Sequence, residues 1–432
     1  MKIIVDGDLD AVSYLDELGY KRQHSLYDIE IPLDDGKLLY NTFTCQLVKL
    51  TKDEYCEYIK EDCLTEEMSI VKKYRELHSV REPVSKFVIF TTSECNARCF
   101  YCFENNHKLK KHMTKDVAHD TAEYIEKLVD NRKVHLSWFG GEPLMNPEAI
   151  DEISSTLASH NVDYYSSMIT NASLIDESIV KRMTELWNLR WMQITIDGTE
   201  TVYNATKKYV YIKGEESPYK QVIKNIRLLL EKKIFVLISL RVSCSNGESL
   251  IELLDEIEEE FGENRYLSVM CAAIHEKRQD IYEPRTIEEE HYVRKHQLIL
   301  MEKAFEKGLF KPALPRKPRI FHCNSDNGRE LIILPNGNVG WCNNYLDSGY
   351  IGDIYSCTFD KNMIQKFQER YSDLEECKNC QLYPQCTRLK ACEGSVPVCT
   401  MEQRKVTLRS LELAMKKCYL DHKIKHEYVD KS

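Results

Sequence analysis

Long apolar runs are missing from this sequence. The first eight residues, from Met1 to Asp8, turn acidic before the apolar core of a secretion signal can form, and no apolar stretch reaches membrane-spanning length. We therefore expect neither a secreted nor a membrane-bound protein. A cationic surface is missing too, because the net charge is −10 and Lys and Arg are well dispersed. A nucleic-acid footprint needs a basic patch, so no nucleic-acid partner is expected.

Cysteine, in contrast, is abundant, with 17 thiols in 432 residues. Without a secretion signal, a reducing compartment would keep these thiols free of disulfides and available for metal. A cytoplasmic location is the prediction. The chain is long enough for two or three domains with a substantial core.

Three thiols lie together at Cys95, Cys99 and Cys102, spaced Cys-x3-Cys-x2-Cys, just after the apolar run Phe87–Phe90. A strand that ends in such a loop can deliver thiolates to the corners of a 4Fe-4S cluster. Because this cluster has four irons, three thiolates leave one iron open to an outside ligand. Zinc is the alternative, but no second Cys-x2-Cys hook or His pair lies nearby.

The triplet and its surroundings resemble the radical S-adenosylmethionine (SAM) superfamily. Tyr101 stands where the family has an aromatic residue before the last cysteine, and Gly140-Gly141-Glu142-Pro143 matches the family's Gly-Gly-Glu-Pro segment. The resemblance implies a SAM-binding cluster on the three cysteines and SAM contacts from these five residues. The glycines would let the backbone approach the ligand closely, and Glu142 would accept from the SAM amino group.

Strand-like and helical patterns alternate from Lys86 to about Lys311. Such repeated units predict parallel strands with right-handed crossovers. The expected fold is α/β, with a partial (β/α)6 TIM-like barrel over residues 84–311 and its ligands at the C-terminal strand ends. The six expected strands are Phe87–Thr91, Val134–Trp138, Tyr164–Ile169, Trp191–Ile196, Phe235–Val242 and Tyr266–Ala272.

Three polar residues at expected strand ends are further candidates for SAM contacts. Asn171 follows the third strand in Thr-Asn-Ala, where the family often has Thr-Asn-Gly. Thr195 lies in Thr-Ile-Asp-Gly, which resembles the Ser-x-Asp-Gly of SPASM-type enzymes, and its hydroxyl would contact the ribose or carboxylate. Arg241 could pair with the SAM carboxylate in bidentate fashion. Alternatively, Arg241 could satisfy a structural carboxylate such as Asp197.

A second cysteine block lies in residues 312–402 and resembles the SPASM domain, which holds two auxiliary 4Fe-4S clusters. With the SAM-binding cluster, the resemblance implies three clusters. The cysteine block departs from the family's usual spacing at one point, because five residues rather than three separate Cys386 and Cys392. The first auxiliary cluster could be completed by Cys357 or remain open to a substrate thiolate, and zinc ribbons are the alternative for the whole block. The family pattern puts the first auxiliary cluster on Cys323, Cys342 and Cys392, and the second on Cys377, Cys380, Cys386 and Cys399.

The N-terminal segment, residues 1–83, combines a strand pair around the turn Asp34-Asp35-Gly36 with helix-like stretches at Lys52–Ile59 and Thr65–Leu77. It resembles the small winged-helix domains in which the leader of a precursor peptide adds as a strand. The alternative is a cap over one end of the barrel. An amphipathic helix is expected within residues 403–432.

These resemblances imply a radical SAM peptide maturase, an oxidoreductase. It would cleave SAM reductively and use the 5′-deoxyadenosyl radical to install a thioether, ether or carbon–carbon cross-link in a precursor peptide with a leader. A flavodoxin or ferredoxin would supply electrons. One alternative is an anaerobic sulfatase-maturating enzyme that makes formylglycine, although Asn343 stands where those enzymes tend to have Asp. The other is a non-catalytic iron–sulfur electron carrier or zinc scaffold.

Overall fold

The computed structural model describes residues 1–20, 24–59, 67–102, 104, 111–212, 217–274, 277–278, 281–282, 285–343, 349–356, 358–370, 373–387, 389 and 399–429. Among these residues, no helix has the length and apolarity needed to cross a membrane. The chain divides into two compact units. The first unit comprises Met1–Arg81, Lys311–Cys323 and Glu369–Ser432, and the second comprises Glu82–Phe310 and Asn324–Gln368.

The second unit is built on a nine-stranded sheet in the order β10-β9-β8-β7-β6-β5-β13-β14-β15. All neighbouring pairs from β5 to β10 are parallel. This confirms the predicted α/β fold with six parallel strands in sequence order. The six strands are β5 (Lys86–Thr92), β6 (Val134–Gly140), β7 (Tyr164–Thr170), β8 (Leu189–Ile196), β9 (Phe235–Val242) and β10 (Leu267–Ala273).

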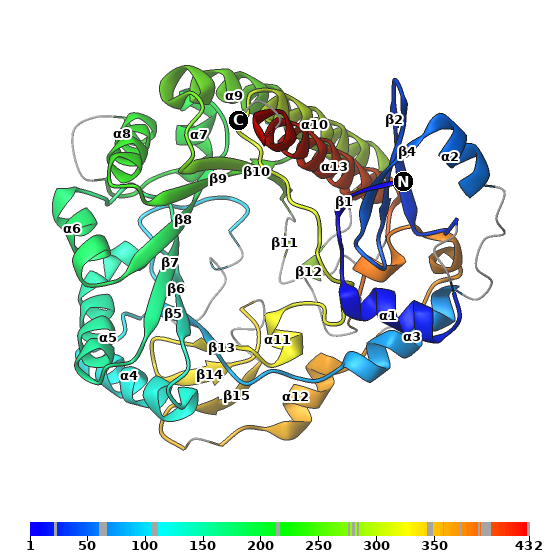
Figure 1. Ribbon diagram of the computed structural model, residues 1–432. Coiled ribbons are helices and arrows are strands. Elements are labelled where there is room, and N and C mark those ends of the chain that lie inside the picture. Colours follow the sequence, from blue (N-terminus) through cyan, green and yellow to red (C-terminus); the bar gives the residue numbers. More distant parts are fainter. Residues whose placement is uncertain are drawn as a thin grey trace. The chain divides into compact units, whose positions relative to one another are not determined.

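Helices follow the outer side of this curved sheet (Figure 1). Each crossover helix buries one apolar face against the sheet, as in α4, where Ala118, Ala122 and Ile125 are fully buried. The crossover helices are α4 (Lys115–Val129), α5 (Pro147–Ser159), α6 (Glu177–Glu185), α7 (Glu200–Lys207), α8 (Pro218–Glu231) and α9 (Gly247–Phe261).

The sheet continues beyond β5 with three short strands that the sequence pattern did not predict. The first of them, β13, pairs parallel to β5, and the next two are antiparallel. Helices α10, α11 and α12 and a short strand pair complete the unit. The bounds are α10 (Ile287–Glu306), α11 (Asn324–Asn327), α12 (Lys361–Gln368), β11 (Lys277–Arg278), β12 (Ile281–Tyr282), β13 (Glu330–Ile333), β14 (Asn338–Gly340) and β15 (Tyr350–Asp353).

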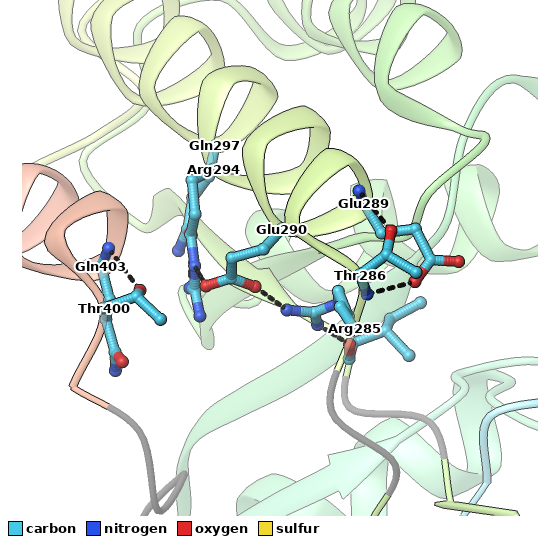
Figure 2. A network of polar contacts seen from close by, with 9 residues as sticks. Arg285, Thr286, Glu289, Glu290, Arg294, Gln297, Thr400 and Gln403 are labelled. Atoms are coloured by element: carbon cyan, nitrogen blue, oxygen red, sulfur yellow. Dashed lines mark hydrogen bonds and ion pairs between the residues drawn. The ribbon is translucent and has the colours of Figure 1, made fainter.

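Two sets of polar interactions stabilise the start of α10, a capping box and a carboxylate bound by two arginines (Figure 2). Thr286 and Glu289 form a capping box, in which each side chain bonds the backbone N–H of the other. Glu290 accepts from Arg285 at 2.6 Å and from Arg294 at 2.7 Å. Burial raises the pKa of Glu290, but the hydrogen bonds and charges of Arg294 and Arg285 outweigh it and leave that pKa below its ordinary value. The helix start is therefore fixed by satisfied backbone donors and by a shielded carboxylate.

The first unit has a four-stranded antiparallel sheet in the order β1-β4-β3-β2. The expected turn joins β2 to β3, with Leu33 opposite Gly36. One face of the sheet packs on α13, where buried Ile29, Leu38 and Tyr40 share a core cluster with residues of that helix. The bounds are β1 (Lys2–Val5), β2 (Asp28–Leu33), β3 (Gly36–Asn41), β4 (Leu47–Thr51) and α13 (Met401–Val429).

Three further helices surround the sheet, namely α1 (Leu9–Glu17), α2 (Lys52–Tyr58) and α3 (Glu67–His78). Both helices expected in residues 1–83 are present, although Thr65 and Glu66 lie outside the described residues. Arg75 of α3 donates to the carbonyl oxygens of Tyr383 at 2.6 Å and Cys386 at 3.0 Å. Segments far apart in the sequence thus form one core in this unit. The winged-helix assignment and the SPASM boundaries stay predictions.

Candidate active site

The loop that follows β5 carries the cysteine triplet. A backbone hydrogen bond fixes the start of this loop, since the N–H of Ser93 donates to the carbonyl oxygen of Lys111 at 3.0 Å. Within it, Cys95 Sγ accepts from Ala97 N at 3.4 Å and the N–H of Cys102 donates to Cys99 O at 3.2 Å. All three thiols are half-buried. The loop thus presents three thiols from one short backbone turn, as the spacing predicted.

Electrostatics link the three thiols. Burial, followed by the charges of Glu142, Cys99 and Cys102, raises the pKa of Cys95 to about 12. Coordination to a cation would reverse this, because a metal-bound thiol is held deprotonated. Among the described residues, no three His, Cys, Asp or Glu side chains are placed to share a single metal ion. A cuboidal cluster binds each thiolate at a different iron corner, so its ligands need not converge on one point.

The end of β6 comes very close to this loop because Gly140 and Gly141 have no side chains. A Cβ on Gly140, whose φ is +120°, would lie 2.1 Å from the carbonyl oxygen of Thr92. A Cβ on Gly141 would lie 2.2 Å from the carbonyl oxygen of Glu94. The close approach lets Gly141 N donate to Thr92 O at 3.1 Å and Glu142 N donate to Glu94 O at 2.8 Å. The glycines are therefore required by backbone contact with the cysteine loop.

Glu142 is fully buried beside the loop, with 1% of its surface exposed. Its Oε1 accepts from Thr170 Oγ1 at 2.7 Å and from Leu144 N at 3.2 Å, and its Oε2 accepts from Asn171 N at 2.8 Å. Burial raises the pKa of this carboxyl, whereas the three hydrogen bonds favour its charged form. Pro143 follows as the first residue of a short 3-10 helix, Pro143–Met145, and accepts from Thr91 Oγ1 through its carbonyl oxygen.

Asn171 connects the end of β7 to the cysteine loop. Its Nδ2 donates to Asn96 Oδ1 at 2.8 Å and lies 3.9 Å from Cys95 Sγ, while Ser173 donates to its Oδ1. The next residue, Ala172, has φ of +62°, the left-handed conformation that favours glycine. This explains why glycine suits the position, and it shows that alanine is accommodated here. Asn225 supports the turn by donating to the carbonyl oxygen of Ala172 at 2.8 Å.

Tyr101 belongs to a buried polar triad that sequence reasoning missed. Its hydroxyl donates to Asp197 Oδ1 at 2.8 Å, and Lys207 Nζ donates to that hydroxyl at 3.1 Å. Lys207 also forms an ion pair with Asp197 Oδ2 at 3.1 Å, although the two side chains are only 4% and 0% exposed. Burial raises the pKa of Cys99, and the charge of Lys207 opposes that rise. A lone lysine ten residues after Asp197 gives no spacing signal.

The last residue of α7, Lys207, also anchors the loop through its backbone, because Arg98 N donates to Lys207 O at 2.8 Å. Asp197 therefore has Lys207 and Tyr101 as partners, and no described ion pair joins it to Arg241. Both roles suggested for Arg241 stay predictions. Thr195 pairs with Ser239 in the register of β8 and β9, and Arg241 lies two residues beyond Ser239. Thr195 and Arg241 therefore share one face of the sheet, and both are half-buried.

Four cysteines of the other predicted block lie close together within the first unit. The pKa of Cys386 is raised by desolvation and then by the charges of Cys399, Cys380 and Cys377. Burial raises the pKa of Cys380, which the same neighbours influence. Arg404 Nε donates to Cys399 Sγ at 3.1 Å, so a cation stands beside the group. The four ligands predicted for the second auxiliary cluster are thus brought together.

The ligands predicted for the first auxiliary cluster fall in different units or outside the described residues. Cys323 is exposed at the end of a segment of the first unit, and Cys342 is half-buried in the second unit. Cys357 and Cys392 lie outside the described residues. Asn343, next to Cys342, accepts a weak hydrogen bond from that thiol at 3.8 Å. The first auxiliary cluster and its fourth ligand stay predictions.

Comparison with known proteins identifies a domain within the chain. Residues 89–259 match the radical SAM superfamily. This match confirms the identification of a radical SAM domain and the prediction of a radical SAM enzyme, a family that binds SAM and a 4Fe-4S cluster. The alternative of a non-catalytic carrier or zinc scaffold is left without support.

Three similar proteins cover most of the chain. The radical SAM cyclopropyl synthase TigE of Paramaledivibacter caminithermalis is 22% identical over 76% of this chain and 73% of its own length. A cysteine-type anaerobic sulfatase-maturating enzyme of Clostridium perfringens is 22% identical over 70% of this chain and 88% of its own. The structure of Streptococcus suis SuiB bound to the precursor peptide SuiA has a TM-score of 0.53 at 15% identity, and covers 85% of this chain and 94% of SuiB. This last likeness concerns the fold.

Proposed function

From the premise that residues 89–259 are a radical SAM domain, we propose that this protein is a peptide maturase that installs an intramolecular cross-link. The bond would be a thioether, an ether or a carbon–carbon bond. The substrate class is proposed from the SuiB structure, which holds a precursor peptide, and the bond-forming chemistry from the name of the cyclopropyl synthase TigE. The observation that carries the proposal is the packing of the cysteine loop against buried Glu142.

The side chains fit a cluster and SAM. Three half-buried thiols on one loop are the donor set of a cluster with an open iron. Gly140 and Gly141 remove the two side chains that would push β6 away from that loop. Glu142 offers carboxylate oxygens in a buried setting, where a charged acceptor binds an ammonium group strongly. We assign the cluster to Cys95, Cys99 and Cys102, and the SAM amino group to Glu142.

When bound, the cluster and SAM together supply a 5′-deoxyadenosyl radical that removes hydrogen from an unactivated carbon. The chain's own residues orient and shield that chemistry. Asn171, held by Asn96 and Ser173, keeps the end of β7 against Cys95. Tyr101 and Lys207 fix the last turn of the cysteine loop through Asp197. Thr195 and Arg241 are proposed as contacts to the ribose and carboxylate of SAM, because they share one sheet face.

Auxiliary clusters complete the proposal. The grouped thiols Cys377, Cys380, Cys386 and Cys399 support a second cluster in the first unit, with Arg404 as its neighbouring cation. Another auxiliary cluster is proposed on Cys323 and Cys342 with Cys392, and Cys357 is the candidate for its fourth ligand. These clusters would accept the electron that remains after the cross-link forms or would bind the substrate. A flavodoxin or ferredoxin is the proposed reductant.

The test is anaerobic reconstitution followed by peptide mass spectrometry. We expect about twelve irons per chain and a peptide, encoded beside the gene, that becomes lighter by about 2 Da with SAM and reductant. Cys99→Ala should lose SAM cleavage entirely. The matched control is Cys56→Ala, which removes an exposed thiol from α2. Full turnover by Cys99→Ala would overturn the cluster assignment, and about four irons with bound zinc would overturn the auxiliary clusters.

Recognition of a leader by residues 1–83 is a further part of the proposal. The sheet has two edge strands, β1 and β2, to which a peptide strand could add. Pro32 in β2 lacks an N–H and weakens that edge for pairing, which favours β1. Deleting the segment would also strip the core that Ile29 and Leu38 share with α13. A sharper test is Ile3→Pro, an exposed position in β1, with peptide affinity as the readout.

A sulfatase-maturating enzyme that makes formylglycine is the second candidate, favoured by the relative from Clostridium perfringens. Asn343 stands against it, because an amide cannot accept a proton usefully near neutral pH. Incubation with a sulfatase peptide that carries the target Cys decides between the two. Formylglycine in that peptide, without any cross-link in the peptides encoded nearby, would favour the second candidate.

A further inference from the structure

A small cavity lies inside the first unit, and its described lining contains no cysteine. It has a volume of about 70 Å³, and α1, α2, α3, the strands β2 and β3 and the turn after β3 contribute to its lining. By this measure a single water needs roughly 10–15 Å³, so the space holds about five water-sized groups. The cavity is therefore large enough for the head group of one side chain and too small for a whole peptide segment.

Two buried polar atoms line this cavity without a hydrogen-bond partner in the described part of the chain. They are Oε1 of Glu67 and the hydroxyl of Tyr27, on side chains whose residues are only 6% and 3% exposed. The other carboxylate oxygen of Glu67 accepts from Leu26 N at 3.0 Å. A buried polar atom without a partner is costly. Such a pair of atoms facing one cavity points to a missing donor.

The charge around the cavity has one sign. Its described lining includes three carboxylates, from Asp16, Asp28 and Glu67, and no Lys, Arg or His. Asp28 accepts from Tyr58 at 2.6 Å and from Asn41 at 3.0 Å, and Asp16 is exposed. Glu67 is therefore the buried carboxylate with an open oxygen. The N-terminal end of α3, where Glu67 lies, favours its charged form. When Glu67 is ionised, no described lining residue supplies a cation to compensate its negative charge.

Aromatic rings supply the remaining walls, from Tyr27, Phe43 and Tyr58. Ring faces attract cations, most strongly where water is excluded. A carboxylate with an open oxygen, an acceptor hydroxyl and aromatic walls together match an organic cation that donates several hydrogen bonds. A divalent metal ion would instead need about six oxygen ligands, and no described site of this kind exists in the chain.

We propose that this cavity binds the head group of a Lys or Arg side chain of the peptide substrate. The inference rests on the proposed function, because it assumes that the substrate is a peptide. It adds a specificity element, namely one cationic residue in the segment of the peptide that contacts the N-terminal sheet. The ammonium or guanidinium group would donate to Glu67 Oε1 and to the oxygen of Tyr27, satisfying both.

The test uses three small probes with the full chain. Nα-acetyl-arginine amide and Nα-acetyl-lysine amide carry the cation, and Nα-acetyl-citrulline amide has nearly the same shape without charge. Saturation-transfer NMR at pH 8 measures their weak binding. We expect one or both cationic probes to bind at least about tenfold more tightly than the citrulline probe. Equal binding of charged and neutral probes, or no binding of any, would overturn the proposal.

Two variants locate the binding. Glu67→Gln removes the charge but keeps an acceptor for Leu26 N, and should weaken the cationic probes about tenfold or more. The matched control is Glu30→Gln, which removes a carboxylate of β2 that is bound by Lys37 and Tyr55 and does not line the cavity. It should bind as the parent does. Unchanged binding in Glu67→Gln would place the cation elsewhere and overturn the assignment.

A second variant distinguishes the loss of a contact in the cavity from a folding defect in Glu67→Gln. Tyr27→Phe removes the open hydroxyl without changing charge, and it should weaken the cationic probes by a smaller factor. The probes do not depend on SAM, so this inference and the proposed function fail separately. Cross-linking of a peptide with no probe binding would remove the cavity proposal alone. Probe binding with no peptide product would leave the cavity as a cation site and remove the maturase function.

Discussion

The backbone N–H of Asn171 donates to Oε2 of Glu142 at 2.8 Å, and this bond ties the end of β7 to the end of β6. The side chain of the same asparagine reaches Asn96 in the cysteine loop at 2.8 Å. One residue therefore sets the position of the acidic group and of the thiol loop together. Preorganisation of this kind is what a site needs to hold a ligand without paying for reorganisation during the reaction.

Glu142→Gln should weaken SAM binding by about tenfold or more, because it replaces a charge-assisted acceptor with a neutral amide. The amide nitrogen would also face one of the donors of Thr170 or Asn171, which now bond the two carboxylate oxygens. Equilibrium dialysis of SAM against the anaerobically reconstituted enzyme measures the effect. The control Glu148→Gln removes an exposed carboxylate of α5 and should bind SAM as the parent does. Equal affinity of all three proteins would contradict this role.

Lys207→Met should cost about 3–5 kcal/mol of stability, because it leaves the buried carboxylate of Asp197 without its cation. The four tryptophans, Trp138, Trp187, Trp191 and Trp341, all lie in the second unit. Urea unfolding followed by tryptophan fluorescence therefore reports on the unit that contains the pair.

Lys133→Met is the matched control for this substitution. Lys133 pairs with Asp163 at 3.0 Å on the surface, with side chains 48% and 63% exposed. Exposed pairs contribute about 0–1 kcal/mol, so the control should stay near the parent. Adding Asp197→Asn to Lys207→Met should recover part of the loss, because the uncompensated charge is then gone. A loss no larger than that of the control would show that the pair is not structurally important.

The parallel strands were predictable because each is a short apolar run that ends at a polar turn. Packing on both faces of a sheet demands such runs, and the strand Phe235–Val242 was predicted with the bounds it has in the structure. The Gly-Gly-Glu-Pro segment was recognised from its resemblance to the family motif, and the structure gives a reason for its glycines, since a Cβ on either would meet the backbone of Thr92 or Glu94. Sequence patterns capture constraints that act over a few residues.

Other features depend on contacts between distant segments. Lys207 meets Tyr101 across 106 positions, and nothing near either residue marks the pair. The same holds for Arg75 of α3, which bonds the carbonyl oxygen of Cys386 across 311 positions. The strands β13 to β15 were missed because each is only three or four residues long. Whether a charge or a short strand is buried depends on contacts in the folded core, and a single sequence does not show those contacts.

Ala172→Gly should leave the protein as stable as the parent or up to about 1 kcal/mol more stable. The left-handed conformation at φ of +62° costs a non-glycine residue about 1 kcal/mol, and the greater freedom of glycine in the unfolded chain offsets part of the gain. Ala149→Gly in α5 is the matched control, because it lies at a buried helical position and should lose about 1 kcal/mol. Equal losses in both variants would show that the conformation at Ala172 carries no strain.

Glu67 should make the stability of the first unit depend on pH. Burial, with a smaller contribution from the charge of Asp28, raises its pKa from 4.5 to about 7, although hydrogen bonds from Ser25 and Leu26 oppose the rise. Asp16, Tyr27 and Tyr58 also line the cavity. The folded state therefore holds a proton more tightly than the unfolded state does. The stabilisation is fully present below pH 4.5 and is lost as the pH rises through about 7.

The Glu67→Gln variant lacks this titration, so its stability relative to the parent should rise between pH 4.5 and pH 8, by up to about 3 kcal/mol. Hydrogen exchange of α3, corrected for intrinsic rates, measures the effect in the unit concerned. Glu30→Gln controls for the loss of one negative charge. A cationic probe at pH 8 should slow exchange in the parent but not in Glu67→Gln, because only the parent has the charged acceptor. A pH-independent difference between parent and variant would contradict the raised pKa and, with it, the buried charge that the cation is expected to neutralise.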